Sequence, residues 1–482
     1  MQKKFITNFF FLIFMNILIK PFWIFGIDRV VQNTTGAAEY GLYSSLLSFS
    51  FLLNILLDLG ITNYNVRNIA QHSHLLKKHF SSIVVLRILL AVIYIGISLI
   101  AGWIMDYDSR RLSILLILLF NQVLASFTLY LRSNISGLQL FKTESIISVL
   151  DRTLMIIFCS VLLWSGWFSK SFPIEYFVWA QTLAYFLTAI ITFIIVAKKA
   201  KFNKLSWNLQ FFLVILKQSY PFAILILLMG FYTNVDSVMI ERLLPDGAFQ
   251  AGIYAQARRL MDAANQFPYL ISILLLPMFS SMIRKKEFVE DLVELSFSII
   301  AIPSIILMAL SVFYNEQLMT ALYHQHVKES ALILRVIMNC FLAFSSVYIF
   351  GTLLTANGSL RYLNYIALGG MILNISLNYY YIPIYGPLGA AMVALVTQYI
   401  TAGAQMLLVH HIFKFTYRWW LFSRYALFTA STFILFSFLQ TLPIKWIFSC
   451  IAGVLLSIAL SFAFFLIRPR SIIRLIRQPG QN

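Results

Sequence analysis

The 482-residue chain is 60% hydrophobic and only 11% charged. Soluble domains carry about 25% charged residues, so this composition excludes a protein whose whole surface faces water. The net charge of +18 would suggest a nucleic-acid partner for a soluble protein. Here we attribute it to positively charged cytoplasmic loops beside anionic lipids. The sequence therefore indicates an integral membrane protein that contacts membrane lipids and binds no nucleic acid.

Apolar runs of about 20 residues recur along the chain and predict transmembrane helices. The runs are continuous rather than alternating, which excludes a β-barrel. We predict an all-α membrane protein of about fourteen transmembrane helices. Residues 28–40 and 241–250 are expected to be longer connections at one membrane face. The predicted spans are 5–27, 41–63, 81–104, 113–133, 144–167, 175–197, 211–240, 251–281, 293–315, 331–355, 364–383, 386–412, 421–439 and 443–467.

The distribution of Lys and Arg predicts the orientation. An even number of helices places both termini on one side of the membrane. The termini and alternate connections carry roughly three times as many cations as the opposite connections, and cytoplasmic loops carry such an excess. We therefore expect a multi-pass protein of the inner, or plasma, membrane with both termini in the cytoplasm.

The sequence contains a duplicated signature. Residues 36–43 and 247–254 both read G-A-x-x-x-G-x-Y, and each follows an acid–Arg pair, Asp28–Arg29 and Glu241–Arg242. Both copies lie between the first and second helix of their half, which predicts two parallel repeats of about six helices each. The predicted parts are an N-lobe at 1–200, a C-lobe at 205–412, and two further helices with a cytoplasmic tail at 413–482.

Several predicted helices contain charged residues, although each costs about 2.5–3.5 kcal/mol at a helix centre. Arg258 and Asp262 are four residues apart and can pair within one helix. Arg259 points about 100° away and needs another partner, either Asp236 or a substrate phosphate. Two other arginines lie nearer helix ends and could instead extend to the interface. These two are Arg87 and Arg335.

The excess of arginine over acid in the spans favours an anionic cargo, because guanidinium groups bind phosphates through paired hydrogen bonds. A cation exporter would need the opposite balance. We predict a water-filled cationic cavity between the lobes, with no cofactor site, metal site or catalytic set. The predicted cavity residues are Arg29, Arg87, Asp236, Arg258, Arg259, Asp262 and Arg335.

Loose motifs covering about residues 5 to 412 resemble the polysaccharide transporter family, the Wzx-type O-antigen flippases. Their order and spacing carry the resemblance. The stretches are Arg29, Gly36 and Tyr40–Tyr43; Asp58–Gly60; Arg67–Ala70; Ser219–Phe222; Asp236; Gly252–Tyr254; Arg259–Leu260; and Asn374, Asn378 and Ile382–Ala391.

The resemblance implies the MOP superfamily, which includes MATE exporters and lipid II flippases. It implies alternating access between two lobes and coupling to an H⁺ or Na⁺ gradient. The implied cargo is an undecaprenyl-diphosphate-linked repeat unit for O-antigen (lipopolysaccharide), capsule or exopolysaccharide synthesis. Two extra C-terminal helices are seen in flippases and are usually absent from MATE exporters. A monomer is expected, with a polymerase as a candidate neighbour. The alternatives are a MATE-type cation-coupled drug antiporter and a lipid II flippase; the short outside connections disfavour a membrane enzyme.

Overall fold

The computed structural model describes residues 15–16, 18–62, 65, 69, 74–138, 140–165, 172–202, 204–415 and 419–466. These residues form helices, turns and connections with no strand, which confirms the all-α class. Eleven helices in this part of the chain are long and apolar enough to cross a membrane. The predicted number of fourteen stays a prediction, because the span at 5–27 is only partly described.

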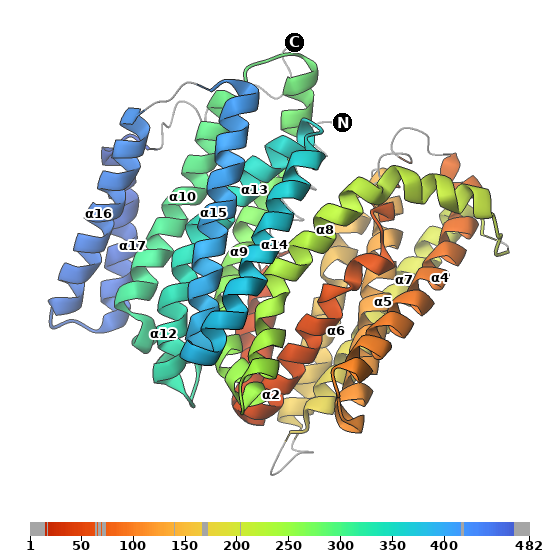
Figure 1. Ribbon diagram of the computed structural model, residues 1–482, viewed down its shortest axis with the longest axis horizontal. Coiled ribbons are helices and arrows are strands. Elements are labelled where there is room, and N and C mark those ends of the chain that lie inside the picture. Colours follow the sequence, from red (N-terminus) through yellow and green to blue (C-terminus); the bar gives the residue numbers. More distant parts are fainter. Residues whose placement is uncertain are drawn as a thin grey trace. The chain divides into compact units, whose positions relative to one another are not determined.

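The chain divides into two compact units (Figure 1). The first unit combines residues 1–256 with 378–386, and the second combines 257–377 with 387–482. The boundary between the two units lies inside helix α9, whereas the boundary between the predicted lobes lies near residue 200. The predicted lobes therefore stay a prediction. The first unit contains the π-helix η1 (Trp23–Asp28), α2 (Arg29–Leu52), the 3₁₀ turn η2 (Asn54–Leu57), α4 (Leu75–Ile104), α5 (Ser109–Gly137), α6 (Phe141–Trp164), α7 (Ile174–Ala200), α8 (Leu209–Leu243) and the start of α9 (Gly247–Arg284).

Helix α5 is central in the first unit, where it packs against α2, α4, α6 and α7. The helix alternates buried apolar residues with buried small polar residues, a composition that lets membrane helices approach closely. Phe80, Tyr130, Ile135 and Phe212 are among the apolar residues at the core of this unit.

Two predicted connections are wrong. Residues 28–40, expected as a loop, are helical except for a break at Gly36 (φ 83°, ψ 170°). The hydroxyls of Thr34 and Thr35 donate to the carbonyls four residues earlier, which satisfies these polar side chains within the helix. In the second copy, α8 continues to Leu243 and α9 begins at Gly247, so the expected connection 241–250 is only a short turn.

The predicted span 41–63 is not one continuous helix. Helix α2 ends at Leu52, η2 follows, and Leu59 (φ 45°) and Gly60 (φ 79°) adopt left-handed backbone conformations. A broken helix leaves carbonyl groups without their usual donors, which is tolerated at membrane depth only where protein or water supplies new ones. The break therefore requires a polar side chain beside it.

The second unit continues α9 and contains the remaining helices, except for the end of α14 from Asn378, which belongs to the first unit. Helix α10 packs against α13, α16 and α17, and α16 packs against α17, so the two C-terminal helices are anchored on α10. Their shared apolar core includes Ile302, Ala309, Phe428 and Phe436. The helices of this unit are α10 (Glu290–Phe313), α11 (Asn315–Leu322), α12 (Val327–Ile337), the 3₁₀ turn η3 (Met338–Cys340), α13 (Phe341–Ala356), α14 (Leu360–Tyr385), α15 (Pro387–Phe413), α16 (Trp419–Thr441) and α17 (Trp446–Ala463).

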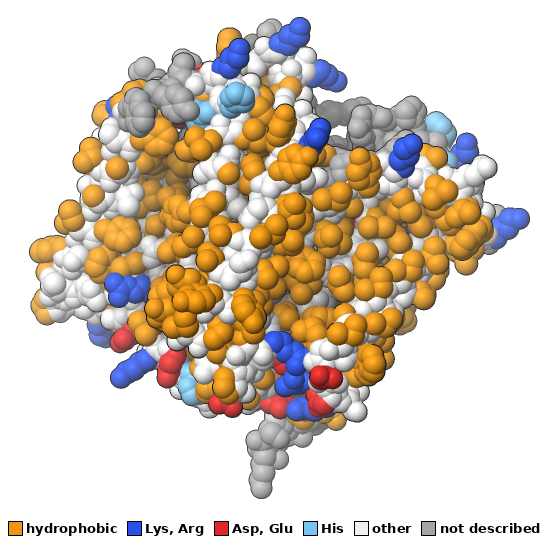
Figure 2. Space-filling model, viewed as in Figure 1, with side chains coloured by type: hydrophobic (Ala, Val, Ile, Leu, Met, Phe, Trp, Pro, Cys, Tyr) orange, Lys and Arg blue, Asp and Glu red, His pale blue; other side chains and the backbone are white. Residues whose placement is uncertain are grey.

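The surfaces of both units carry large apolar side chains, as expected for surfaces that face lipid. Trp103 on α4 and Ile434 on α16 are about 70% exposed, at 72% and 70%. Figure 2 shows hydrophobic side chains over most of the visible face, and charged side chains near its upper and lower ends. The two units therefore present apolar bands between charged ends.

Candidate functional site

The two copies of the repeated signature pack directly against each other within the first unit. A Cβ atom added to Gly41 would lie 1.7 Å from the carbonyl oxygen of Ala248, and one added to Gly252 would lie 1.9 Å from that of Ala37. Each glycine therefore contacts the alanine of the other copy. Close approach of helix backbones at small residues is a common form of packing in membranes. Gln32 adds a hydrogen bond from its side-chain amide to the Gly252 carbonyl, at 3.1 Å.

A tyrosine and a buried aspartate pair in each half of the repeat. The Tyr40 hydroxyl donates to Asp28, at 2.7 Å, and the Tyr254 hydroxyl donates to Asp236, at 3.1 Å. Asp236 also accepts a hydrogen bond from the Asn378 side chain, at 2.8 Å, and is only 2% exposed. Asp236 therefore lies in a buried polar cluster contributed by α8, α9 and α14.

Ion pairs gather where α5 begins. Arg110 contacts Glu39 of α2 at 2.6 Å and Glu175 of α7 at 2.8 Å, and these side chains are partly exposed. Arg111 contacts Glu241 at the end of α8 at 3.0 Å, and the Glu241 side chain is 1% exposed. Arg242 lies over the ring of Tyr107, 4.3 Å from its centroid. The second acid–Arg pair therefore anchors α8 to the start of α5.

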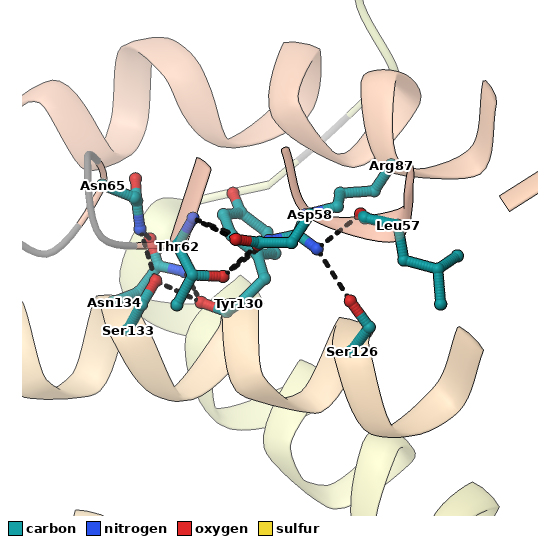
Figure 3. A network of polar contacts seen from close by, with 9 residues as sticks. All are labelled: Leu57, Asp58, Thr62, Asn65, Arg87, Ser126, Tyr130, Ser133 and Asn134. Atoms are coloured by element: carbon teal, nitrogen blue, oxygen red, sulfur yellow. Dashed lines mark hydrogen bonds and ion pairs between the residues drawn. The ribbon is translucent and has the colours of Figure 1, made fainter. Parts of the chain in front are cut away.

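Arg87 lies at the break that follows α2 (Figure 3). Its guanidinium pairs with the carboxylate of Asp58 and donates to the carbonyl oxygen of Leu57 at 2.8 Å. It also donates to Thr62 at 2.7 Å and to Ser126 at 3.0 Å. These groups supply the polar partners that the broken helix requires.

The Arg87 network has a polar extension on the same side of α5. The Asn65 amide donates to Ser133 at 2.7 Å and to Asn134 at 3.0 Å, and Arg87 lies 5.2 Å from the centroid of the Tyr130 ring. Arg87 is 5% exposed, so it does not extend to the interface. Its charge is balanced by Asp58, which gives Arg87 a structural role at this break.

The predicted pair on α9 forms in the second unit. Arg258 contacts Asp262 at 3.1 Å, which confirms the intrahelical pairing. Arg259 contacts the other oxygen of the same carboxylate at 3.7 Å, so two guanidinium groups adjoin one carboxylate. All three side chains are partly exposed, between 20% and 33%. The alternative pairing of Arg259 with Asp236 joins residues of different units and stays a prediction.

Arg29 and Arg335 differ from Arg87 in their surroundings. Neither forms an ion pair with any acidic residue in the part of the chain that the structure describes. Arg29 is partly buried, and its Nε atom has no hydrogen-bond partner among those residues; Arg335 is exposed in the last turn of α12. Both guanidinium groups therefore retain capacity to bind an anion.

Three residues of these clusters were not predicted from the sequence as site residues. Asp58 and Glu241 each balance a buried or partly buried arginine far away in the chain, and Asn378 is a neutral residue whose role depends on Asp236. The signal available for Asp58 is the Asp-Leu-Gly string, because Gly60 adopts a left-handed conformation at a break. Glu241 belongs to the acid–Arg pair before the second signature and Asn378 to a stretch of the family resemblance, but neither pattern identifies the residue's partner.

Comparisons with known proteins agree with this fold. A family model described as polysaccharide biosynthesis protein matches residues 5–283. The uncharacterised membrane protein MJ1375 of Methanocaldococcus jannaschii is 25% identical over 381 residues, which cover 75% of this chain and 88% of that protein. The family match extends across both copies of the repeat.

Solved structures share the fold at low sequence identity. The lipid II flippase MurJ in an inward closed conformation gives a TM-score of 0.73 with 16% identity, covering 96% of this chain and 100% of that one. An inward-facing multidrug resistance MATE transporter of the MOP superfamily gives 0.64 with 11% identity, covering 83% and 94%. The family match confirms the resemblance seen in the sequence. The chain belongs to the polysaccharide biosynthesis protein family and has the fold shared by MurJ and the MATE transporters.

Proposed function

We propose that this protein flips an undecaprenyl-diphosphate-linked oligosaccharide across the inner membrane by alternating access, as a secondary transporter and not an enzyme. The product would serve O-antigen, capsule or exopolysaccharide synthesis. The family match supports a role in polysaccharide biosynthesis, and the MurJ-like fold supports movement of a lipid-linked cargo. The chemistry of the charged residues on α9 supports an anionic headgroup.

The observation that carries the proposal is the Arg258–Arg259–Asp262 cluster. Arg258 lies eleven residues after the first residue of α9, Gly247, or about 17 Å along the helix axis at 1.5 Å per residue. The hydrocarbon core of a membrane is about 30 Å thick, so the cluster is far from both ends of a spanning helix. Charged side chains at this depth are expensive and usually serve a transport pathway. Two guanidinium groups beside one carboxylate favour an anionic ligand.

Arg29 of the first unit and Arg335 of the second are the other two arginines that we propose for binding phosphate. Each lacks an acidic partner in the described part of the chain, and guanidinium groups bind phosphate oxygens with two parallel hydrogen bonds. Arg87, although predicted for the cavity, is occupied by Asp58 and by three other acceptors. We therefore propose that Arg87 stabilises the broken helix and that the other four arginines hold the cargo.

The crossing of the two repeat copies is proposed to seal one side of the pathway. The backbones of α2 and α9 meet at Gly41 and Gly252, which leaves no room for a cargo between them. Both signatures occupy predicted extracytoplasmic ends, so the seal would separate during outward opening. Alternating access then requires that the contact between α2 and α9 be stable enough to close the pathway and weak enough to separate when the pathway opens.

Asp236 is the proposed coupling residue for H⁺ or Na⁺. It is buried, and Tyr254 and Asn378 donate hydrogen bonds to its carboxylate. A buried carboxylate that gains or loses a cation changes the free energy of the cluster around it, which provides a route from ion binding to conformation. The coupling ion acts with Asp236, whereas the cargo acts with the arginines.

The test uses Arg259→Ala, Arg259→Lys and Arg361→Ala in cells that lack the native gene. Arg361 lies in the first turn of α14, is exposed, and contacts Tyr365, so its variant is the matched control for loss of one arginine. We expect Arg259→Ala to abolish surface polysaccharide and to accumulate lipid-linked repeat units in the inner leaflet. Arg259→Lys should retain part of the activity, and Arg361→Ala should retain nearly all.

Membrane abundance of each variant is measured by immunoblot, so that loss of transport is separated from loss of protein. Normal surface polysaccharide in Arg259→Ala cells would contradict the proposal. A drug or organic cation antiporter is the second candidate, because the MATE fold also matches. It predicts altered drug resistance and unchanged polysaccharide in the same variants.

A further inference from the structure

Arg424 lies near the start of α16 beside two aromatic rings. Its guanidinium carbon is 4.4 Å from the ring centroid of Trp420, four residues earlier on α16, and 5.9 Å from that of Phe465, just beyond the end of α17. Such cation–π contacts are attractive within about 6 Å. Helices α16 and α17 pack against each other (Figure 1), so Arg424 joins the start of one to the end of the other.

No acidic side chain balances the charge of Arg424. Every Asp and Glu of the sequence lies in the part of the chain that the structure describes, and none of them forms an ion pair with Arg424. No Asp or Glu follows Glu329 in the sequence, so helices α13 to α17 contain no acidic residue. An anion that pairs with Arg424 must therefore come from outside the protein's side chains.

Part of the Arg424 guanidinium is shielded from water and has no hydrogen-bond partner. The Nη1 atom is buried and donates to no acceptor among the described residues, although the side chain as a whole is partly exposed. Buried donors are almost always paired, and leaving one unpaired is costly. A phosphate suits this position, because guanidinium groups bind phosphate oxygens through paired, charge-assisted hydrogen bonds.

The surface around Arg424 is suited to lipid. Trp420 and Leu427 of α16 are 40% and 56% exposed, and Phe462 of α17 and the following Phe465 are 47% and 65% exposed. The predicted spans place the start of α16 and the end of α17 at the cytoplasmic face of the membrane, and tryptophan is enriched at the level of the lipid headgroups. Acyl chains can therefore lie on the apolar surface while a headgroup contacts Arg424.

The sequence adds positive charge at the same predicted face. Clusters of Lys and Arg directly cytoplasmic of a spanning helix attract anionic lipids. Phosphatidylcholine and phosphatidylethanolamine carry no net charge, and a soluble anion has no acyl chain to cover the apolar surface. These features together favour an anionic glycerophospholipid. The cations that precede α16 or follow α17 in the sequence are Lys414, Arg418, Arg468, Arg470, Arg474 and Arg477.

We propose that Arg424 binds the phosphate of an anionic glycerophospholipid from the inner leaflet, with the acyl chains on the exposed apolar residues of α16 and α17. Trp420 and Phe465 orient the guanidinium through their ring faces. The bound lipid stabilises the pair of C-terminal helices by holding the start of α16 to the residues after α17. This lipid site is independent of the cargo and of the proposed flippase function.

The test titrates phosphatidylglycerol, phosphatidylethanolamine or phosphatidylcholine into delipidated full-length protein in detergent. Native mass spectrometry measures the dissociation constant of the first lipid that binds. Wild-type protein is expected to bind phosphatidylglycerol more tightly than the other two lipids. Arg424→Ala should weaken phosphatidylglycerol binding roughly tenfold, because hydrogen bonds to the charged phosphate are lost.

Two further variants separate this site from a general attraction between cations and anionic lipids. Arg361 also lies at a predicted cytoplasmic helix end, is exposed, and is 5.8 Å from the Tyr365 ring centroid, so Arg361→Ala is the matched control and should leave affinity unchanged. Arg424→Lys keeps the charge but cannot form two parallel hydrogen bonds, so its affinity should be intermediate.

Thermal unfolding of the same proteins separates lost binding from lost folding. Without lipid, Arg424→Ala should melt close to the wild type, and added phosphatidylglycerol should raise the melting temperature of the wild type more than that of the variant.

Equal phosphatidylglycerol affinity of wild type and Arg424→Ala would overturn the proposal, as would equal losses in Arg424→Ala and Arg361→Ala. Displacement of phosphatidylglycerol by millimolar inorganic phosphate would assign Arg424 to a soluble anion instead. Undecaprenyl diphosphate that binds more tightly than phosphatidylglycerol, and loses that advantage in Arg424→Ala, would assign it to the cargo.

Discussion

Gly41 and Gly252 occupy equivalent positions in the two copies of the repeat, and each packs against the backbone of the other copy. An added Cβ atom would lie within 2 Å of a carbonyl oxygen at both positions, at 1.7 Å and 1.9 Å. The contact is reciprocal, so one duplicated sequence supplies both surfaces of one helix crossing. This explains why glycine and alanine recur with the same spacing in both halves.

The first prediction concerns this crossing. Gly41→Leu places a side chain against the Ala248 carbonyl and should destabilise the purified protein by at least about 1–3 kcal/mol, as overpacking does. Thermal unfolding in detergent, followed by intrinsic fluorescence, measures the effect. Gly96→Leu is the matched control, because no atom lies within 4 Å of a Cβ at that position. Equal melting temperatures for the two variants would show that the helices do not cross closely at Gly41.

The repeat shows how far the sequence could predict this fold. The duplicated string predicted two equivalent elements, but their mutual contact depends on tertiary packing that no local pattern encodes. The polar residues Gln32, Thr34 and Thr35 are typical of a loop, although the structure shows this segment as helix. These side chains instead bond to backbone carbonyls, two within their own helix and one on α9.

The charged residues also include contacts that the sequence predicts and contacts that depend on tertiary packing. The Arg258–Asp262 pair was predictable, because both residues lie on one helix at a spacing of four. The partner of Arg87 was not, because Asp58 is 29 residues away and is brought to it by a break in α2. Helix periodicity predicts which residues of one helix share a face and can pair. It does not predict where a helix breaks, and the break determines which side chains reach a neighbouring helix.

The second prediction tests the network at that break. Arg87→Ala should cost somewhat less than the about 3–5 kcal/mol that follows loss of one partner of a fully buried pair, because the Asp58 carboxylate, which is only 21% exposed, would lose its cation. The double variant Asp58→Asn/Arg87→Met should be more stable than Arg87→Ala, since no uncompensated charge remains. Thermal unfolding of the three proteins forms the comparison. A double variant less stable than Arg87→Ala would indicate that hydrogen bonds to Leu57 and Ser126, rather than charge balance, dominate at this break.

The third prediction separates ion coupling from folding. Asp236→Asn keeps the size of the side chain and an acceptor for Asn378, so the protein should remain abundant in the membrane. The variant cannot gain and lose a proton, and transport should no longer respond to collapse of the ion gradient. Lipid-linked oligosaccharide translocation in proteoliposomes, with and without a protonophore or a sodium ionophore, measures this dependence.

Asp291→Asn provides the control for loss of one acid, since Asp291 is exposed at the start of α10. Gradient-dependent transport that persists in Asp236→Asn would assign coupling to another acidic residue.

The fourth prediction contrasts two neighbouring arginines at the start of α5. Arg110 bridges Glu39 and Glu175 through side chains that are 33–48% exposed, and exposed ion pairs contribute only about 0–1 kcal/mol. Arg111 contacts Glu241, which lies near the end of α8 and whose side chain is buried. Removing one partner of a buried pair costs about 3–5 kcal/mol, and the partial exposure of Arg111 lowers that figure. Arg111→Ala should therefore reduce the melting temperature clearly more than Arg110→Ala does.

The same two variants also test how the stability contributed by each ion pair depends on ionic strength. The Arg110 contacts are exposed, so whatever stability they contribute should fall between low and high ionic strength, with screening over about 10 Å at 0.1 M. The Arg111–Glu241 contact is shielded, so the deficit of Arg111→Ala should persist at 1 M salt. A deficit that disappears at high salt would mean that water and ions reach Glu241. In that case the acid–Arg pair of the second repeat copy would not anchor α8 to α5.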